Sequence, residues 1–234
     1  MEKSLCQVVV VLLFLCPLGA QAEDGSAGER CAIPAATVSL LQSQLSLVTH
    51  YADANGGIFG RILPGPNRSW SAIVDRRGVL CSVINSGNDP FPASRGIAIA
   101  KASTANGFSN SGLALSTAML YASAQPGGWG YGLNSTNPFN PDFDAPGSGI
   151  GRVPGGTVTF GGGVALYSNG QVIGGLGVSG DTACADHAVA FRMRHLAGLD
   201  GTPGGAGSDN IQYASGPTPK GFEHPHCLPT DITP

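Results

Sequence analysis

Residues 161–180 read GGGVALYSNGQVIGGLGVSG, and this stretch decides the fold. Two apolar runs, 161–167 and 171–178, flank the dipeptide Asn169-Gly170. An Asn-Gly pair between two such runs is a strong hairpin signal, because both residues of the favoured turn need positive φ angles. The stretch therefore predicts a β-hairpin.

The residues around this hairpin carry helical and strand patterns. Residues 181–196 are predicted to form a helix that Asp181 or Thr182 would cap. Three further helices are expected: one that opens at Pro34 and ends at Gly56-Gly57, and two at residues 93–105 and 116–124. The helix at 93–105 has unusually small side chains, which let another backbone or a flat ligand approach closely.

An earlier hairpin is predicted from residues 70–75 and 79–84, which are rich in β-forming side chains. Between them lies the turn sequence Asp75-Arg-Arg-Gly78. Hairpins interrupted by helices, rather than strict alternation of strand and helix, indicate the α+β class. We expect one antiparallel sheet with helices packed on it in a single domain, residues 23–196.

The composition excludes several classes of protein. The chain has 36 Gly and 17 Pro in 234 residues, and 12% of its residues are charged, against about 25% in ordinary soluble domains. Hydrophobic residues make up 42%, which is enough for a core and argues against wholesale disorder. The net charge of -3 lacks the basic footprint of a nucleic-acid-binding protein.

The first 22 residues have the pattern of a cleavable secretory signal, with Lys3, an apolar run from Val8 to Leu15 and small residues at 20–22. The apolar run is shorter than the roughly 20 residues of a membrane span, so no stable membrane insertion is expected. We predict a secreted or periplasmic protein.

Removal of the signal leaves four cysteines, at positions 31, 81, 184 and 227. An even number in an exported chain predicts two disulfides. Three pairings are open. Cys31 with Cys81 and Cys184 with Cys227 is favoured, because each pair would tie a terminal segment to an ordered element.

Two segments fall outside the regular pattern. Residues 125–157 carry nine Gly and five Pro with scattered aromatic residues, which indicates a long loop or lid. Residues 197–234 form a second Gly/Pro-rich segment, predicted to be an irregular tail. Sequons for N-glycosylation occur at Asn67 and Asn134, and their use depends on the export route.

Ligand-binding patterns are sparse. Gly175, Gly177 and Gly180 satisfy G-x-G-x-x-G, but no acidic residue follows at the end of a second parallel strand, so a dinucleotide is disfavoured. Exposed N–H groups around Gly177, Gly180 and Asp181 are left as a candidate anion-binding turn.

Histidines and cysteines raise the question of a metal. His224, His226 and Cys227 could bind zinc or copper together with a distant ligand, although a disulfide at Cys227 is favoured. His187 is either an axial haem ligand or a surface or capping histidine. The chain has no G-x-S-x-G, S-x-x-K or C-x-x-C, and Asp142 and Asp144 lie in the long loop, so no catalytic residues are predicted.

Four colinear motifs together resemble the GlcG/HbpS-like haem-binding family, which includes the C-terminal domain of PduO-type proteins. These motifs are SAIVDRRGVL at 71–80, AIAKASTA at 98–105, GGGVAL at 161–166, and GQVIGGLGVSG at 170–180 with Asp186 and Ala190. The resemblance implies a profilin-like fold, homo-oligomers, and binding of haem b or, less well supported, a corrinoid.

The resemblance also implies the site. Lys101 and Thr104 lie on the helix that lines the haem in such proteins, with the Thr104 hydroxyl at the iron. The family's Arg-x-Asp after the first hairpin keeps only its acidic end at residues 85–89. The propionate-pairing arginine is therefore either lost or replaced by Arg95.

Three functions follow as alternatives. The favoured one is an exported, non-catalytic haem-binding protein for scavenging, transfer or sensing, with Lys101 and Arg95 at the propionates. The second is an enzyme or accessory subunit acting on a small organic acid or alcohol. The third is an oligomeric scaffold whose loop at 125–157 binds a protein partner.

Overall fold

The computed structural model describes residues 29–49, 69–87, 91, 93–136, 147–229 and 234. The predicted signal segment, the sequon at Asn67, and Asp142 and Asp144 lie outside these residues. Within the described part of the chain, no helix is long and apolar enough to cross a membrane.

Four strands form one antiparallel sheet in the order β2-β1-β4-β3. Their bounds are β1 (Trp70–Asp75), β2 (Leu80–Asn85), β3 (Gly163–Ser168) and β4 (Gln171–Ser179). Both predicted hairpins are confirmed. In the second, Asn169 and Gly170 have φ angles of 50° and 71°, as a turn of this type requires.

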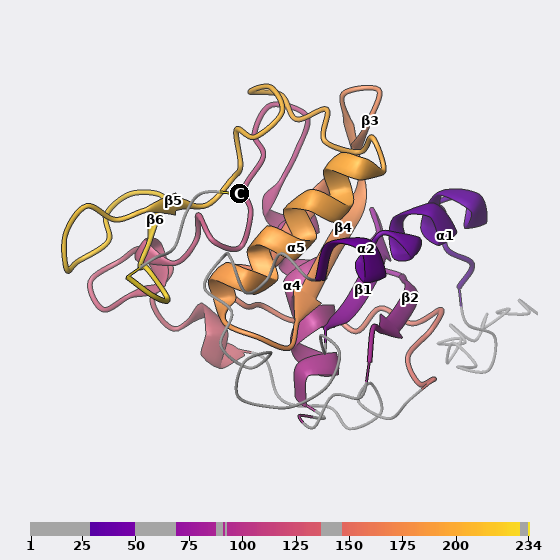
Figure 1. Ribbon diagram of the computed structural model, residues 1–234, viewed down its shortest axis with the longest axis horizontal. Helices are drawn as coiled ribbons and strands as arrows, with labels where there is room; N and C mark the ends of the chain where they lie inside the picture. The colour runs from indigo at the N-terminus through magenta and orange to yellow at the C-terminus, as the bar shows by residue number, and fades with distance from the viewer. Residues whose placement is uncertain (1–28, 50–68, 88–90, 92, 137–146, 230–233) are drawn as a thin grey trace, which may run out of the picture.

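Helices cover both faces of the sheet, which confirms the α+β class and the single domain (Figure 1). One face holds α4 (Ala93–Phe108). The other holds α1 (Ala35–Ser43), α2 (Leu45–Val48) and α5 (Ala183–Leu196). The side chain of Thr182 caps α5 by accepting the N–H of Ala185, so Thr182 rather than Asp181 is the capping residue.

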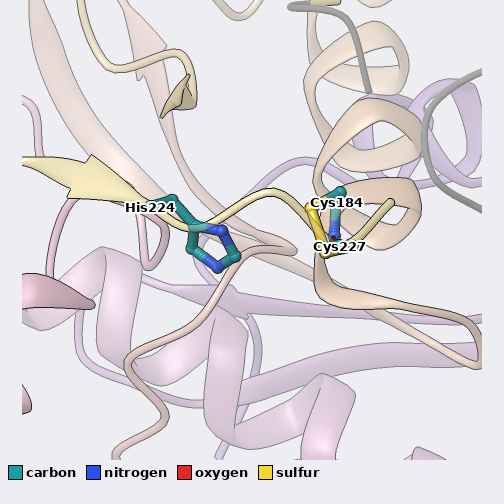
Figure 2. Close-up of side chains that lie close together, drawn as sticks. All are labelled: Cys184, His224 and Cys227. Carbon is teal, nitrogen blue, oxygen red and sulfur yellow. Dashed lines mark hydrogen bonds between the residues drawn. A yellow bond between two sulfur atoms is a disulfide. The ribbon is translucent and has the colours of Figure 1, made fainter. Parts of the chain in front are cut away.

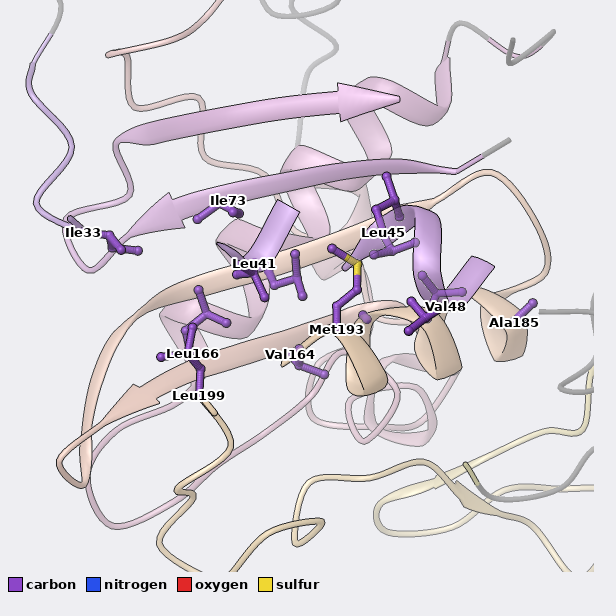
Figure 3. Packing of buried hydrophobic residues seen from close by; sticks show 14 residues of the cluster. Ile33, Leu41, Leu45, Val48, Ile73, Val164, Leu166, Ala185, Met193 and Leu199 are labelled. Carbon is purple, nitrogen blue, oxygen red and sulfur yellow. The ribbon is translucent and has the colours of Figure 1, made fainter. Parts of the chain in front are cut away.

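The alternation of side chains along the strands divides the core into two layers. Ile73 points to the α5 side, where it joins a cluster that includes Leu41, Leu176 and Met193 (Figure 3). Its neighbours in β1 point to the α4 side and contact smaller residues such as Ala98 and Ala102. The two layers therefore differ in side-chain size.

Glycines in β4 explain how α4 approaches so closely. A Cβ atom added to Gly177 would lie 2.0 Å from the carbonyl oxygen of Ala98, and one added to Gly175 would lie 2.1 Å from that of Ala102. No side chain fits at either position. The small-residue face of α4 thus serves the approach of another backbone.

The helix expected at residues 116–124 is wrong. This segment consists of turns that end in the short 3₁₀ helix η3 (Ala122–Ala124). Thr117 explains the difference, because its N–H donates to Gly163 O at 3.0 Å and its Oγ1 accepts the N–H of Gly163 at 2.8 Å. These two bonds tie the beginning of the segment to the start of β3.

The tail is more ordered than its composition suggests. It contains a two-residue parallel pair, β5 (Gln212–Tyr213) with β6 (Glu223–His224). Asp209 makes two 2.6 Å hydrogen bonds to the buried guanidinium of Arg194 on α5. An ion pair of this kind is not visible in the sequence pattern, because the tail has no periodicity that would place Asp209.

Both favoured disulfides are present. Cys31 is bonded to Cys81 and Cys184 to Cys227. The first joins the segment before α1 to β2, and the second joins the first turn of α5 to the tail.

Because β4 and α4 lie so close, a glycine-to-alanine substitution should change the free energy of unfolding in opposite directions at Gly177 and at Gly107. Gly177→Ala should lower the free energy of unfolding by about 3 kcal/mol, because its Cβ must displace the backbone of α4. Gly107→Ala, at an exposed position of α4 with nothing within 4 Å of the added Cβ, should raise it by up to about 1 kcal/mol. Urea unfolding measures both. Equal effects at the two positions would contradict the close approach.

Candidate functional site

The outer face of α4 is covered by residues 147–162, which we call the strap. The strap pairs with the edge of β2, where Leu80 donates its N–H to Arg152 O at 2.8 Å and accepts the N–H of Gly151 at 2.9 Å. It then crosses α4 and leads into β3. The later part of the predicted insertion therefore lies over the helix that the sequence assigned to the site.

Thr104 meets the strap directly. Its Oγ1 lies 2.7 Å from Ala100 O and 3.2 Å from Gly156 O, and it accepts the N–H of Val158 at 2.9 Å. The side chain is 2% exposed. Gly156 has a φ of 109°, and an added Cβ would lie 2.7 Å from the Cβ of Ala100, so the strap backbone rests on the helix itself.

Arg95 holds the other part of the strap. It lies about two and a half turns before Thr104 on α4, is 2% exposed, and donates from Nη2 to Ser148 O at 2.7 Å. The two residues that the sequence assigned to iron and propionate thus both bond backbone atoms of the strap.

Lys101 lies elsewhere. Its Nζ is 2.7 Å from Asp186 Oδ2 on α5 and 3.0 Å from Val178 O, with the ring of Phe160 4.9 Å away. The pair is buried, and this burial raises the pKa of Asp186 to about 7 and lowers the pKa of Lys101, while their mutual attraction opposes both shifts. Lys101 therefore links the two helical layers across the end of the sheet.

His187 is neither a surface nor a capping residue, since it is fully buried on α5. Its Nε2 lies 3.1 Å from both Asn210 Oδ1 and the N of Ile211. Burial lowers the pKa of His187 to about 3, so the imidazole is neutral. Because α5 and α4 lie on opposite faces of the sheet, the structure does not bring His187 to Thr104.

The candidate anion-binding turn is occupied by the protein's own groups. Gly177 lies inside β4 rather than in the turn. The N–H of Asp181 donates to Asp186 Oδ1 at 3.0 Å, and the N–H of Thr182 donates to Asp181 Oδ1 at 2.7 Å. Gly180 supplies a φ of 143° between the strand and these bonds.

The candidate metal ligands of the tail do not all lie together. His224 lies near the disulfide between Cys184 and Cys227 (Figure 2), and a ligand atom of each of the three lies within 4.8 Å of the others. His226 is exposed and stacks on Tyr213 at a centroid distance of 4.4 Å. The sequence analysis grouped His226 with His224 and Cys227, but the side chain of His226 lies against Tyr213 instead. It did not predict that Cys184 is a neighbour of His224.

A cavity of about 360 Å³ lies apart from all of these residues. Its lining is largely apolar, from residues that include Ile33, Val172 and Leu199, and Arg76 contributes a guanidinium group. Arg76 Nη1 also donates to the side chain of Asn106. None of the site residues predicted from the sequence lines this cavity.

These features define a class: single-domain α+β proteins whose antiparallel sheet lies between helical layers, with a buried Lys–Asp pair joining the layers. The family model for "Haem degrading protein HbpS-like" matches residues 69–193, more than half of the chain. The protein therefore belongs to the HbpS-like family.

A solved structure supports the fold, and two others match less closely. A PduOC–heme complex matches with a TM-score of 0.51 and 24% identity over 70% of this chain and 94% of that one. The Klebsiella pneumoniae protein ORFY matches at 0.49 with 22% identity, covering 74% and 95% of the two chains. An HbpS double mutant of Streptomyces reticuli matches at 0.41 with 17% identity, covering 77% and 96%. A search of curated proteins found no match.

The buried pair gives a test of its structural role. Asp186→Asn should lower the free energy of unfolding by about 4 kcal/mol, because it leaves the Lys101 ammonium buried without a counter-charge. The double variant Lys101→Met/Asp186→Asn should recover about 2 kcal/mol of that loss. Urea unfolding of Asp186→Asn, Lys101→Met and the double variant measures the coupling, and a loss in the double variant equal to the sum of the two single losses would contradict it.

His187 gives a pH dependence. Its pKa in the folded protein, about 3, lies below its ordinary value of 6.5, so between these values only the unfolded chain takes up the proton and acidification destabilises the fold. Between pH 7 and pH 5 the wild type should lose about 2 kcal/mol more than His187→Gln. Urea unfolding at each pH provides the comparison, and parallel losses in the two proteins would contradict a neutral buried imidazole.

Proposed function

We propose that this protein binds haem on the outer face of α4, in place of the strap, and that it is exported and acts in haem scavenging, transfer or sensing. Family membership over residues 69–193 carries the proposal. The heme complex among the solved structures with this fold is consistent with it. The two disulfides suit an oxidising compartment outside the cytoplasm, and assembly into homo-oligomers is part of the proposal.

The fit of the residues to haem depends on the strap. The outer face of α4 presents a stripe of small residues, Gly96, Ala100 and Ser103, which are partly exposed even beneath the strap. A planar ring can lie on such a stripe once the backbone at Gly156 has left Ala100. The strap and a porphyrin compete for the same face.

Thr104 and Arg95 are the residues that would hold the group. Bound haem would supply an iron that can take an oxygen ligand. It would also supply two propionate carboxylates that can pair with a cation. Thr104 Oγ1 offers the oxygen when it is released from Gly156 and Val158. Arg95 offers a guanidinium to a propionate when it is released from Ser148.

Lys101 and His187 do not fit this site. Lys101 is 0% exposed, and its Nζ is paired with Asp186 beside Phe160, at the end of the strap that leads into β3. His187 lies in the other helical layer. A neutral hydroxyl is a weaker iron ligand than imidazole or thiolate, so we propose a labile haem, suited to transfer or sensing.

A haemin titration followed by the Soret band tests the proposal. The wild type should shift the band, and Thr104→Val should change the band position, because the isosteric side chain lacks the oxygen ligand. Arg95→Gln should weaken binding by about tenfold without changing the band position. Ser39→Ala is the control, since it removes an exposed hydroxyl from α1, in the other helical layer.

The band position separates the role of Thr104 as a ligand from its role in holding the strap. A loosened strap would raise the affinity of Thr104→Val but leave the spectrum of bound haem as in the wild type. A wild-type protein that leaves the Soret band unchanged would contradict haem binding. A shift that is identical in all variants would place the haem elsewhere.

Haem degradation is the second candidate, because the description of the family model names it. The same samples distinguish it from binding. After addition of a reductant in air, a binding protein retains its Soret absorbance, whereas a degrading enzyme loses it progressively with repeated turnover.

A further inference from the structure

The disulfide between Cys184 and Cys227 lies beside an imidazole in a buried setting. His224 is 2% exposed, and a nitrogen of its ring lies within 4.8 Å of both sulfur atoms (Figure 2). Two thiolates and one imidazole are the ligand types that zinc prefers. In the structure the two sulfurs are bonded to each other, and the ring of His224 accepts a hydrogen bond from Gly161.

The disulfide is not the sole anchor of His224. The residue belongs to β6, its carbonyl accepts the N–H of Ala214 at 2.9 Å, and its ring lies 4.9 Å from the ring of Tyr121. These contacts would remain if the disulfide opened. The imidazole would therefore stay beside the two sulfurs.

The hydrogen bonds of His224 favour the tautomer that a metal needs. Nδ1 lies 2.7 Å from Pro225 O and donates its proton to that carbonyl. Nε2 then carries the lone pair, which accepts the N–H of Gly161 at 3.3 Å and would have to exchange this hydrogen bond for a metal. A backbone carbonyl that accepts the Nδ1 proton is a common support for a histidine that ligates through Nε2.

The first turn of α5 stabilises negative charge on the sulfurs. Cys184 lies in that turn, and its backbone N–H is 3.1 Å from Cys227 Sγ. The N-terminal end of a helix carries partial positive charge and stabilises thiolates. Cys227 is only partly buried, whereas Cys184 is fully buried.

The second disulfide offers a contrast within the same chain. Cys31 and Cys81 lie near Asp75, whose carboxylate atoms fall within the same distance. Both oxygens of Asp75 are already used, since they accept N–H groups of Ala32, Arg77 and Val79. A metal at Asp75 would have to displace three backbone N–H groups, whereas a metal at His224 Nε2 would have to displace the N–H of Gly161 alone.

We propose that reduction converts the Cys184–Cys227 disulfide into a zinc site formed by both cysteine sulfurs and His224 Nε2, with water as the fourth ligand. A tertiary phosphine and water would reduce the disulfide to two thiols and leave the phosphine oxide. Zinc binding then releases the two thiol protons. At a Zn–S distance of about 2.3 Å, the sulfurs separate to about 3.8 Å in a tetrahedral site.

Cobalt(II) is the probe for the test, because its thiolate charge-transfer and d–d bands report ligand type and geometry. The full chain is reduced with a phosphine, titrated with Co²⁺ and then with Zn²⁺, and compared with the oxidised chain. Reduced wild type should bind one Co²⁺ with thiolate bands that Zn²⁺ removes. His224→Gln should weaken binding by at least about tenfold.

Paired cysteine variants assign the site. Cys184→Ser/Cys227→Ser should abolish the thiolate bands, and Cys31→Ser/Cys81→Ser should retain them. If either double variant fails to fold, His224→Gln decides alone, since its oxidised form keeps both disulfides and a thermal transition shows that it is folded. Equal Co²⁺ binding by oxidised and reduced chains, or by wild type and His224→Gln, would overturn the proposal.

Discussion

The packing of the β4 backbone against the backbone of α4 is the constraint on which the rest of the structure depends. At Gly175 and Gly177 the two backbones are so close that not even a methyl group fits between them. This closeness fixes the height of α4 above the sheet. It also limits the inner face of the helix to residues such as Ala98 and Ala102.

The same closeness brings Lys101 within reach of the opposite helical layer. A longer gap between α4 and the sheet would leave its Nζ short of Asp186, which lies on the other side. Gly162 makes the passage possible, since a Cβ there would lie 2.6 Å from that nitrogen. The buried Lys101–Asp186 pair can therefore form because β4 and α4 approach so closely at Gly175 and Gly177. Its two charges stabilise the fold.

Local chemistry made much of the fold predictable, and long-range contacts made the rest unpredictable. The Asn169-Gly170 turn, the first hairpin and the cap at Thr182 each depend on a few neighbouring residues. In place of the helix expected at 116–124 there are turns, and Thr117 Oγ1 accepts the N–H of Gly163, a contact that no local pattern encodes. For the same reason the sequence could name Lys101 and Thr104 but not their partners, 85 and 54 residues away.

The scarcity of charge connects the composition to the proposed function. With only 12 basic residues in the chain, each buried cation that the fold uses is lost to ligand binding. Lys101 and Arg194 pair with buried carboxylates. On α4, the groups that remain for ligand binding are the neutral hydroxyl of Thr104 and the guanidinium of Arg95. Both are bonded to carbonyl groups of the strap, which a ligand must displace. A site built from such groups favours exchange of its ligand over permanent retention, because every bond that forms to the ligand replaces a bond to the strap.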